Sequence, residues 1–133
     1  MEANELRLGN FIHHCTMIHG VVLPLDYIKQ VRGITRNGVD LTLPSDEQNY
    51  FLEFNWIVPI KLTEEILFKS GFGEVGIYNN VFHKENFRIV IGNESCLFQI
   101  HEDGSCVGIE IYSLHQLQNL YFALTGKELD VNL

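Results

Sequence analysis

Four apolar segments between residues 77 and 111 constrain the fold of this chain most strongly. They read "IYNNVFH", "NFRIVIG", "SCLFQIH" and "CVGIEIY", and short polar turns separate them. The second segment places Phe87, Ile89 and Ile91 at every other position, a period that is typical of a β-strand with one buried face. Short turns between such segments join antiparallel neighbours. The sequence therefore predicts a four-stranded antiparallel meander.

A helix is predicted directly after the meander, in "YSLHQLQNLYFALTGKEL", residues 112–129. Ser113 and Gln116 have the spacing of a capping box, and Gly126 is placed to end the helix. Five apolar side chains fall on one arc at helical spacing: Leu114, Leu117, Leu120, Tyr121 and Leu124. We expect this apolar stripe to pack on one face of the meander.

Phe122 lies about opposite that stripe, near His115 and Asn119. In one interpretation a second surface, such as the N-terminal β unit, buries Phe122, as happens to most large apolar side chains. In the other, Phe122 is an exposed anchor for a protein partner and the two polar residues form its rim. His115, Asn119 and Phe122 are therefore our candidate partner-binding residues.

The first sixty residues are predicted to form short strands, for example "VDLTLP" and "YFLEFNWIVPI". Asn37-Gly38 is expected to supply the positive φ angles of a tight hairpin turn, and Gly33 is a candidate β-bulge. Four or five short, bent strands with little helix predict a small β unit of SH3-like type.

A short helix is predicted between the two β regions, in "KLTEEILFKSGF". Thr63 is a natural N-cap, Glu64 and Glu65 fall in the first turn, and Gly71 is placed to end the helix. The expected architecture is thus α+β: an N-terminal β unit, a short helix, the meander and a C-terminal helix. We expect a single domain over residues 1–133, with possible sub-domains at 1–60 and 61–133.

The stretch "GFGEVG", Gly71 to Gly76, matches the dinucleotide-binding fingerprint letter for letter. That fingerprint must follow a strand and open a helix, so that the phosphate meets the helix N-terminus. Here the predicted helix comes before the glycines and a strand after them. We therefore interpret the stretch as a helix stop followed by a turn.

The charge of the chain argues against nucleic acid as a partner. Seventeen acidic residues against nine basic ones give a net charge of −8 with neutral histidines. Such a surface repels phosphate backbones, whereas it is compatible with a protein partner. No apolar run approaches the ~20 residues that span a bilayer, and the acidic start "MEANELRLGN" lacks the apolar core of a signal peptide. We expect a cytoplasmic protein without membrane association.

A metal site is conceivable in "HHCTMIH", where the candidate ligands are His13, Cys15 and His19. On a strand, His13 and Cys15 point to the same face. Structural zinc takes four ligands and catalytic zinc three plus water, so this segment alone does not complete a site. We expect no cofactor.

The three cysteines, Cys15, Cys96 and Cys106, are expected to be free thiols. A turn near residues 103 and 104 pairs residue 101 with Cys106, which leaves Cys96 about five positions out of register for a disulfide. The chain has no nucleophile elbow and no H-E-x-x-H motif. These observations predict a protein without catalytic activity.

Several strings resemble a known family of short uncharacterised proteins from phages, prophages and mobile elements of Bacteroidetes-type bacteria. They are "ELRLGN", "IKLTEEILFKSGF", "NFRIVI" and "HQLQNLYFALTGKEL". The resemblance runs from about Glu5 to Leu129, and it implies a small accessory protein inside a bacterial host cell, with no established activity to carry over.

We therefore expect a non-catalytic protein-interaction factor, with inhibition of a bacterial defence nuclease as one concrete form. One alternative is a small metal-dependent or thiol enzyme that uses the region from His13 to His19. Another is a structural or assembly subunit of a phage. Neither the partner nor the oligomeric state follows from the sequence.

Overall fold

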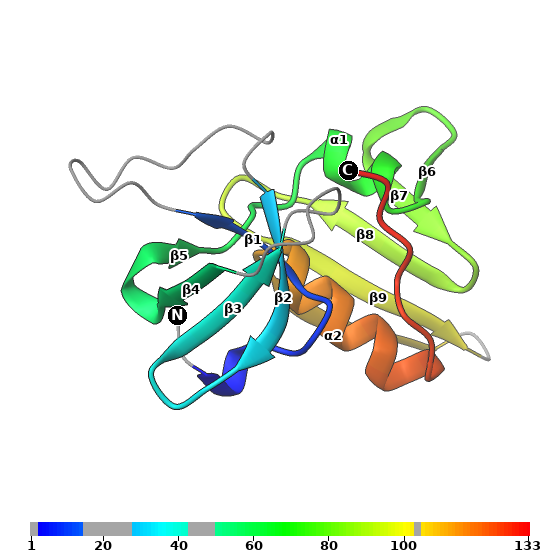
Figure 1. Ribbon diagram of the computed structural model, residues 1–133. Helices are drawn as coiled ribbons and strands as arrows, with labels where there is room; N and C mark the ends of the chain where they lie inside the picture. Colours follow the sequence, from blue (N-terminus) through cyan, green and yellow to red (C-terminus); the bar gives the residue numbers. More distant parts are fainter. Residues whose placement is uncertain (1–2, 15–27, 43–49, 103–104) are drawn as a thin grey trace.

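The computed structural model of the protein describes residues 3–14, 28–42, 50–102 and 105–133. This described part of the chain is α+β, with two antiparallel five-stranded sheets and two α-helices (Figure 1). A short 3-10 helix, η1 (Ala3–Glu5), precedes the first strand. The larger helices are α1 (Glu64–Lys69) and α2 (Leu114–Thr125).

The first sheet holds the N-terminal strands in the order β4-β3-β2-β1-β5. A 3-10 helix, η3 (Phe54–Trp56), joins the last two strands of this unit. The strands are β1 (Phe11–His14), β2 (Ile28–Ile34), β3 (Gly38–Thr42), β4 (Tyr50–Glu53) and β5 (Ile57–Val58).

The second sheet is a meander in the order β10-β9-β8-β7-β6. Its last four strands confirm the predicted meander, and the fifth, β6, lies in the glycine-containing stretch after α1, where no separate strand was predicted. The strands are β6 (Gly73–Val75), β7 (Tyr78–Lys84), β8 (Phe87–Ile91), β9 (Cys96–Glu102) and β10 (Ser105–Ile111).

Two glycines of the first sheet had been assigned roles from the sequence. The register of the β2–β3 pair shifts between Val31 and Gly33, which confirms the predicted bulge. The prediction for Asn37-Gly38 was wrong, because neither residue has a positive φ. Gly38 is required for a different reason: a Cβ atom there would lie 2.2 Å from the backbone oxygen of Leu52 on β4.

Both helices begin and end where the sequence predicted. The Thr63 side chain accepts a hydrogen bond from the Ile66 backbone N–H of α1 at 3.3 Å. Ser113 and Gln116 form the capping box of α2. Gly71 and Gly126 follow the two helices with φ of +83° and +71°, the left-handed conformation that glycine adopts without strain.

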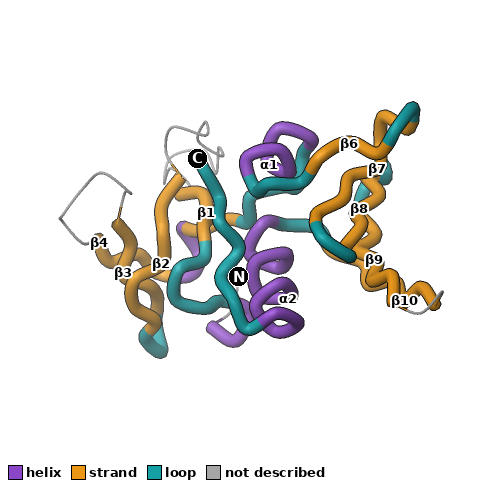
Figure 2. The backbone as a smooth tube through the Cα atoms, turned by 90° about the vertical axis from the view of Figure 1, so that its right-hand side faces the viewer, coloured by secondary structure: helices purple, strands orange, loops and turns teal. Residues whose placement is uncertain are grey.

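Helix α2 lies between the two sheets, as Figure 2 shows. Leu114, Leu117 and Tyr121 are buried in the main core cluster together with residues of the meander, so the stripe packs on the sheet as predicted. The same cluster contains Phe11 of β1 and Ile28 of β2, so it joins both halves of the chain.

A smaller core cluster fills the interior of the N-terminal unit. It contains Ile12 of β1, which faces the opposite side of the sheet from Phe11 because side chains alternate along a strand. Strand β1 therefore has both faces buried, one in each cluster. The smaller cluster consists of Leu6, Ile12, Val31, Val39, Leu41 and Ile57.

The last eight residues return from the end of α2 toward α1 (Figure 1). Leu129 is buried in the main cluster, and the backbone N–H of Asn132 donates to the Lys69 oxygen at 2.8 Å. The tail thus links the end of the chain to the short helix.

Strand β9 pairs with β10 in the register that the sequence predicted. His101 lies opposite Cys106, and Cys96 lies opposite Ile111. Cys96 is a free, buried thiol. Burial raises its pKa, which Lys61 and the Gly92 backbone only partly offset, so the thiol is protonated and unreactive at neutral pH.

Candidate functional site

The face of α2 opposite the apolar stripe binds the N-terminal segment of the same chain. Gln118 is buried, and its side-chain oxygen accepts a hydrogen bond from the Phe11 backbone N–H at 2.9 Å. Its Nε2 donates to the Gly9 oxygen at 3.2 Å. The neighbouring Asn119 accepts from Asn10 Nδ2 at 2.9 Å. These bonds fix the start of β1 against the helix.

Arg7 also connects the N-terminal segment to α2 and to the residues that follow it. Its guanidinium lies 4.2 Å from the ring centroid of Phe122 and forms a bidentate ion pair with Glu128. Its Nε donates to Asn119 Oδ1 at 3.3 Å. The ion pair lowers the pKa of Glu128, because the hydrogen bond favours the charged carboxylate. Planar stacking and two parallel hydrogen bonds are interactions that suit arginine better than lysine.

The three candidate partner-binding residues are therefore engaged inside the chain. His115 is 3% exposed, and its Nδ1 lies 3.0 Å from Ser113 Oγ. Asn119 also donates to the Glu5 backbone oxygen at 3.0 Å. Phe122 is 38% exposed and has Arg7 on one side of its ring. The N-terminal segment contacts this face of α2 through Arg7 and Asn10, but Phe122 remains exposed beside Arg7. Binding of a partner there stays a prediction.

We expect Gln118→Leu to lower the free energy of unfolding by about 2 kcal/mol. The substitution leaves the buried Phe11 N–H without an acceptor, and the desolvation cost of that N–H is then no longer offset by a hydrogen bond. The leucine is similar in size, so the change mainly removes the bonds to Phe11 and Gly9. Urea unfolding measures the effect, and hydrogen exchange should show faster exchange at the Phe11 amide. Unchanged exchange at that amide would contradict the assignment.

The predicted metal ligands do not form a described cluster. His13 is 7% exposed on β1, between Ile28 of β2 and Val58 of β5. Cys15 and His19 lie outside the described residues. Within the described ranges, no group of three or more His, Cys, Asp and Glu side chains is placed to hold a metal ion. In the same part of the chain, His13 Nδ1 is buried without a hydrogen-bond partner.

Two buried histidines make the stability of the protein sensitive to acid. Burial lowers the pKa of both His13 and His115 from 6.5, and in His115 the charge of Glu5 opposes this shift. The unfolded chain takes up protons near pH 6.5, whereas the folded chain takes them up only at lower pH.

We therefore expect these two histidines to leave the free energy of unfolding unchanged above about pH 7.5 and to lower it below about pH 6.5, by up to about 1.4 kcal/mol per pH unit for each histidine. Urea unfolding followed by the fluorescence of Trp56, the single tryptophan, measures it. His115→Gln should reduce the slope. A flat profile down to about pH 5.5 would rule this out.

A groove that we did not predict from the sequence lies at the N-terminal end of α2. Two hollows of about 310 and 330 Å³ meet there, and both are lined by Lys61 and Tyr112. We call it the Lys61–Tyr112 groove. Its walls come from the β5–α1 connection, the start of β7, the β8–β9 turn and the start of α2.

Two extended stretches form the floor of the groove. Lys61 forms an isolated antiparallel bridge with Ser113, and the Leu114 backbone N–H donates to the Ile60 oxygen at 2.8 Å. Tyr112 is 51% exposed, while its backbone N–H donates to Gln116 Oε1 at 2.7 Å. The ring is therefore presented to solvent by a fixed backbone.

The groove combines apolar, amide and charged groups. The first hollow is lined by Lys61, Leu62, Thr63, Glu64, Asn79, Asn80, Ile91, Gly92, Glu94, Ser95, Cys96 and Tyr112. The second is lined by Glu5, Pro59, Lys61, Tyr112, Ser113, His115 and Gln116. Three glutamates face one lysine. Such a surface can bind a ligand through apolar contacts and through hydrogen bonds.

A sequence signal for this groove did exist, in the connection before α1. Ile60 and Leu62 are buried, whereas Pro59, Lys61 and Thr63 are exposed. This period of two predicts an extended segment with one free face. Tyr112 gave no such signal, because a large residue just before a helix is also expected to pack against it.

Comparison with known proteins does not assign the chain to a group: no protein-family model, curated protein or solved structure matches it. None of the helices in the described residues is long and apolar enough to cross a membrane. Function must therefore be argued from the site itself.

Proposed function

We propose that the protein is a non-catalytic protein-interaction factor that binds a partner through the Lys61–Tyr112 groove. The observation that carries the proposal is the shape of this site, in which two hollows share a half-exposed tyrosine. Tyrosine is enriched among the residues that dominate binding energy. A mixture of apolar and polar side chains is the usual composition of such a contact.

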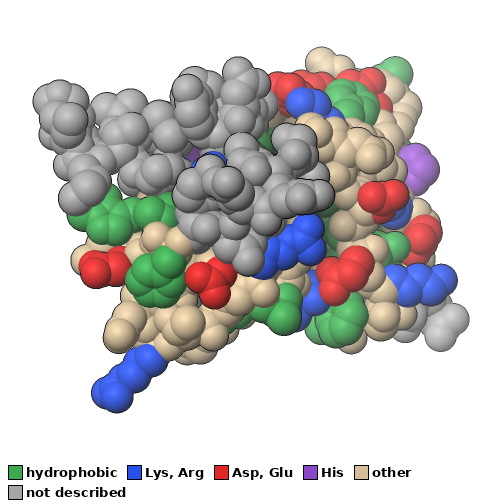
Figure 3. Space-filling view, in the orientation of Figure 1, with side chains coloured by type: hydrophobic (Ala, Val, Ile, Leu, Met, Phe, Trp, Pro, Cys, Tyr) green, Lys and Arg blue, Asp and Glu red, His purple; other side chains and the backbone are tan. Residues whose placement is uncertain are grey.

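The charge distribution supports a protein partner over a nucleic acid. The chain carries a net charge of −8. On the described part of the face in Figure 3, acidic side chains are spread among single basic and hydrophobic ones. An acidic surface steers the approach of a basic protein and repels phosphate.

The origin of the protein in a phage or mobile element is part of the proposal, and it rests on the resemblance of the quoted strings. A nuclease that defends a bacterium against such elements carries a positive groove for its substrate. An acidic protein that occupies this groove competes with nucleic acid. Inhibition of a defence nuclease inside the host cell is thus the concrete form that we favour.

The N-terminal unit is proposed to be an SH3-like barrel. The strand order and the short 3-10 helix between β4 and β5 support this arrangement. In the proposed function this unit supplies one end of the groove, through Glu5 and Pro59.

A capture experiment with two matched variants tests the proposed function. Tyr112→Ala removes the aromatic ring from the groove, and Phe51→Ala removes a ring of equal exposure from β4, outside the groove. Wild type and Phe51→Ala should capture the same protein from a bacterial lysate, and Tyr112→Ala should not. Equal capture by both variants would remove the groove from the proposal.

The captured protein is then purified and its nuclease activity measured. Saturation with wild type should abolish the activity, and Tyr112→Ala should leave it unchanged. Unaltered activity at saturating wild-type protein would exclude the inhibitor form.

A further inference from the structure

We propose that the Lys61–Tyr112 groove takes an extended, positively charged peptide segment, with a basic side chain in each hollow. The inference rests on the proposed function and adds the chemical class of the ligand. It follows from the shape of the groove, its hydrogen-bonding groups and its charge.

The shape favours an extended chain over a compact ligand. Lys61 and Tyr112 line both hollows, so the hollows lie next to each other. In an extended peptide, side chains on the same face are about 7 Å apart, so residues two or four positions apart enter neighbouring hollows while the backbone crosses between them.

The groups along the first hollow suit a peptide backbone. Asn79 and Asn80 are exposed at the start of β7, and an amide side chain offers both donors and an acceptor. Leu62 and Ile91 provide apolar lining beneath them. The half-exposed ring of Tyr112 then supplies the largest apolar contact at the crossing point.

The charged residues that line the groove favour a positively charged ligand. Glu64 and Glu94 line the first hollow, and Glu5 lines the second. Lys61 is the single basic residue among the lining residues, so the groove carries a net negative charge. Burial keeps His115, beside Glu5, neutral at pH 7. A cationic side chain in each hollow meets a carboxylate there.

Lys61 sets the pattern of the segment. It lies where the hollows meet, so a basic residue directly opposite it is repelled. The complementary ligand has basic residues at both ends and an acidic residue between them. The reversed pattern places like charges together at all three points, which costs affinity.

A pair of labelled peptides tests this inference. The first has arginine at both ends, aspartate in the middle and leucine between them; the second has glutamate at both ends and lysine in the middle. Both have blocked termini and a fluorescein label, and binding to the purified full-length protein is followed by fluorescence anisotropy. We expect the first peptide to bind at least about tenfold more tightly than the second.

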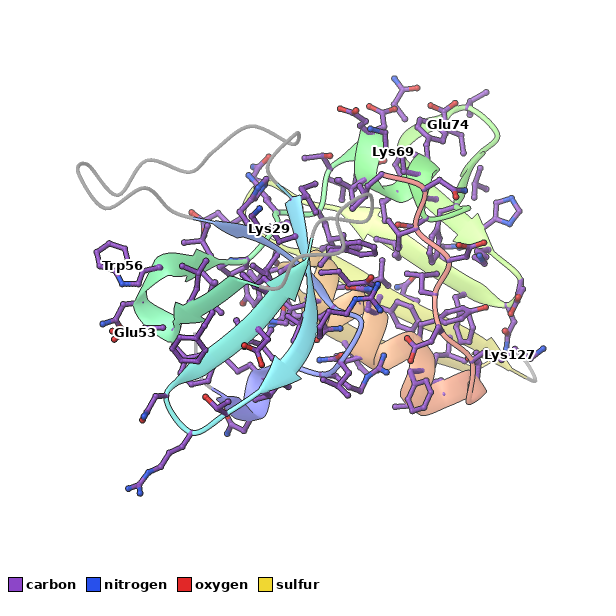
Figure 4. The ribbon with its side chains drawn as sticks, in the orientation of Figure 1. Lys29, Glu53, Trp56, Lys69, Glu74 and Lys127 are labelled. Atoms are coloured by element: carbon purple, nitrogen blue, oxygen red, sulfur yellow. The ribbon has the colours of Figure 1, made fainter. Side chains whose placement is uncertain are left out.

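Two double variants with the same net charge distinguish binding in the groove from general attraction of a basic peptide to an acidic protein. Glu64→Gln with Glu94→Gln removes two carboxylates from the groove. Glu53→Gln with Glu74→Gln removes two exposed carboxylates at opposite ends of the molecule (Figure 4). The groove pair and Tyr112→Ala should each weaken the first peptide about tenfold, whereas the distant pair should leave it unchanged. Circular dichroism checks that each variant is folded.

Three outcomes would overturn the inference: no binding of the first peptide, equal binding of both peptides, or equal weakening by both charge pairs. A dimer in sedimentation velocity that Tyr112→Ala abolishes would also overturn it, since a second copy would then occupy the groove. If Tyr112-dependent capture of a protein persists while the peptide fails, the proposed function survives and only this ligand class is wrong.

Discussion

Leu117→Ala is expected to lower the free energy of unfolding by about 3 kcal/mol, because it leaves a cavity in the main core. Leu117 is fully buried in the cluster that contains residues of both sheets. The whole chain should therefore unfold at lower urea concentration as one unit. Trp56 lies at the outer end of the N-terminal unit (Figure 4), so its fluorescence reports that unit, and far-UV circular dichroism reports the helices and both sheets.

Both signals should shift to the same midpoint in Leu117→Ala. Leu124→Ala is the matched control, since Leu124 belongs to the same stripe of α2 but is 44% exposed. This second substitution should cost less than about 1 kcal/mol. An unchanged Trp56 transition in Leu117→Ala would show that the N-terminal unit folds independently of the shared core.

Gly38→Ala is expected to destabilise the protein by about 3 kcal/mol, although alanine is the smallest side chain that can be added. Its Cβ would lie 2.2 Å from the Leu52 oxygen and 2.9 Å from the Glu53 Cα. These are backbone atoms of β4, so no side-chain rotation relieves the overlap and the β3–β4 pair has to separate. Thermal unfolding measures the loss.

Gly73→Ala provides the comparison for this prediction. Gly73 lies on β6, its φ is not positive, and a Cβ there has no heavy atom within 4 Å. Its substitution should change stability by less than about 0.5 kcal/mol. If Gly38→Ala were equally mild, the close approach of β3 and β4 would not be a constraint on the sequence.

The strings that carry the family resemblance have a structural use in this chain. Arg7 and Asn10 of "ELRLGN" contact Asn119 of "HQLQNLYFALTGKEL" directly. The backbone oxygen of Lys69, in the middle string, accepts a hydrogen bond from the Asn132 backbone N–H of the C-terminal tail. These residues fasten the parts of the fold together.

The sequence alone determined the local elements of this protein. The period of two located the last four strands of the meander, and the capping residues located both helices. The Gly33 bulge and the offset of Cys96 also followed from local spacing. These signals work because backbone preference, capping and turn formation act between residues that are a few positions apart.

The tertiary structure decided what lies on the other side of α2, why position 38 must be glycine, and where the groove forms. Gln118 lies outside the predicted apolar stripe of α2, yet it is buried and binds the Phe11 backbone, 107 positions away in the chain. Residues next to Gln118 in the sequence do not indicate which distant group it will bind, and residues next to Lys61 and Tyr112 do not indicate that a groove will form between them. Only the packing of the two sheets around α2 brings such residues together, and local rules carry no information about contacts at that separation.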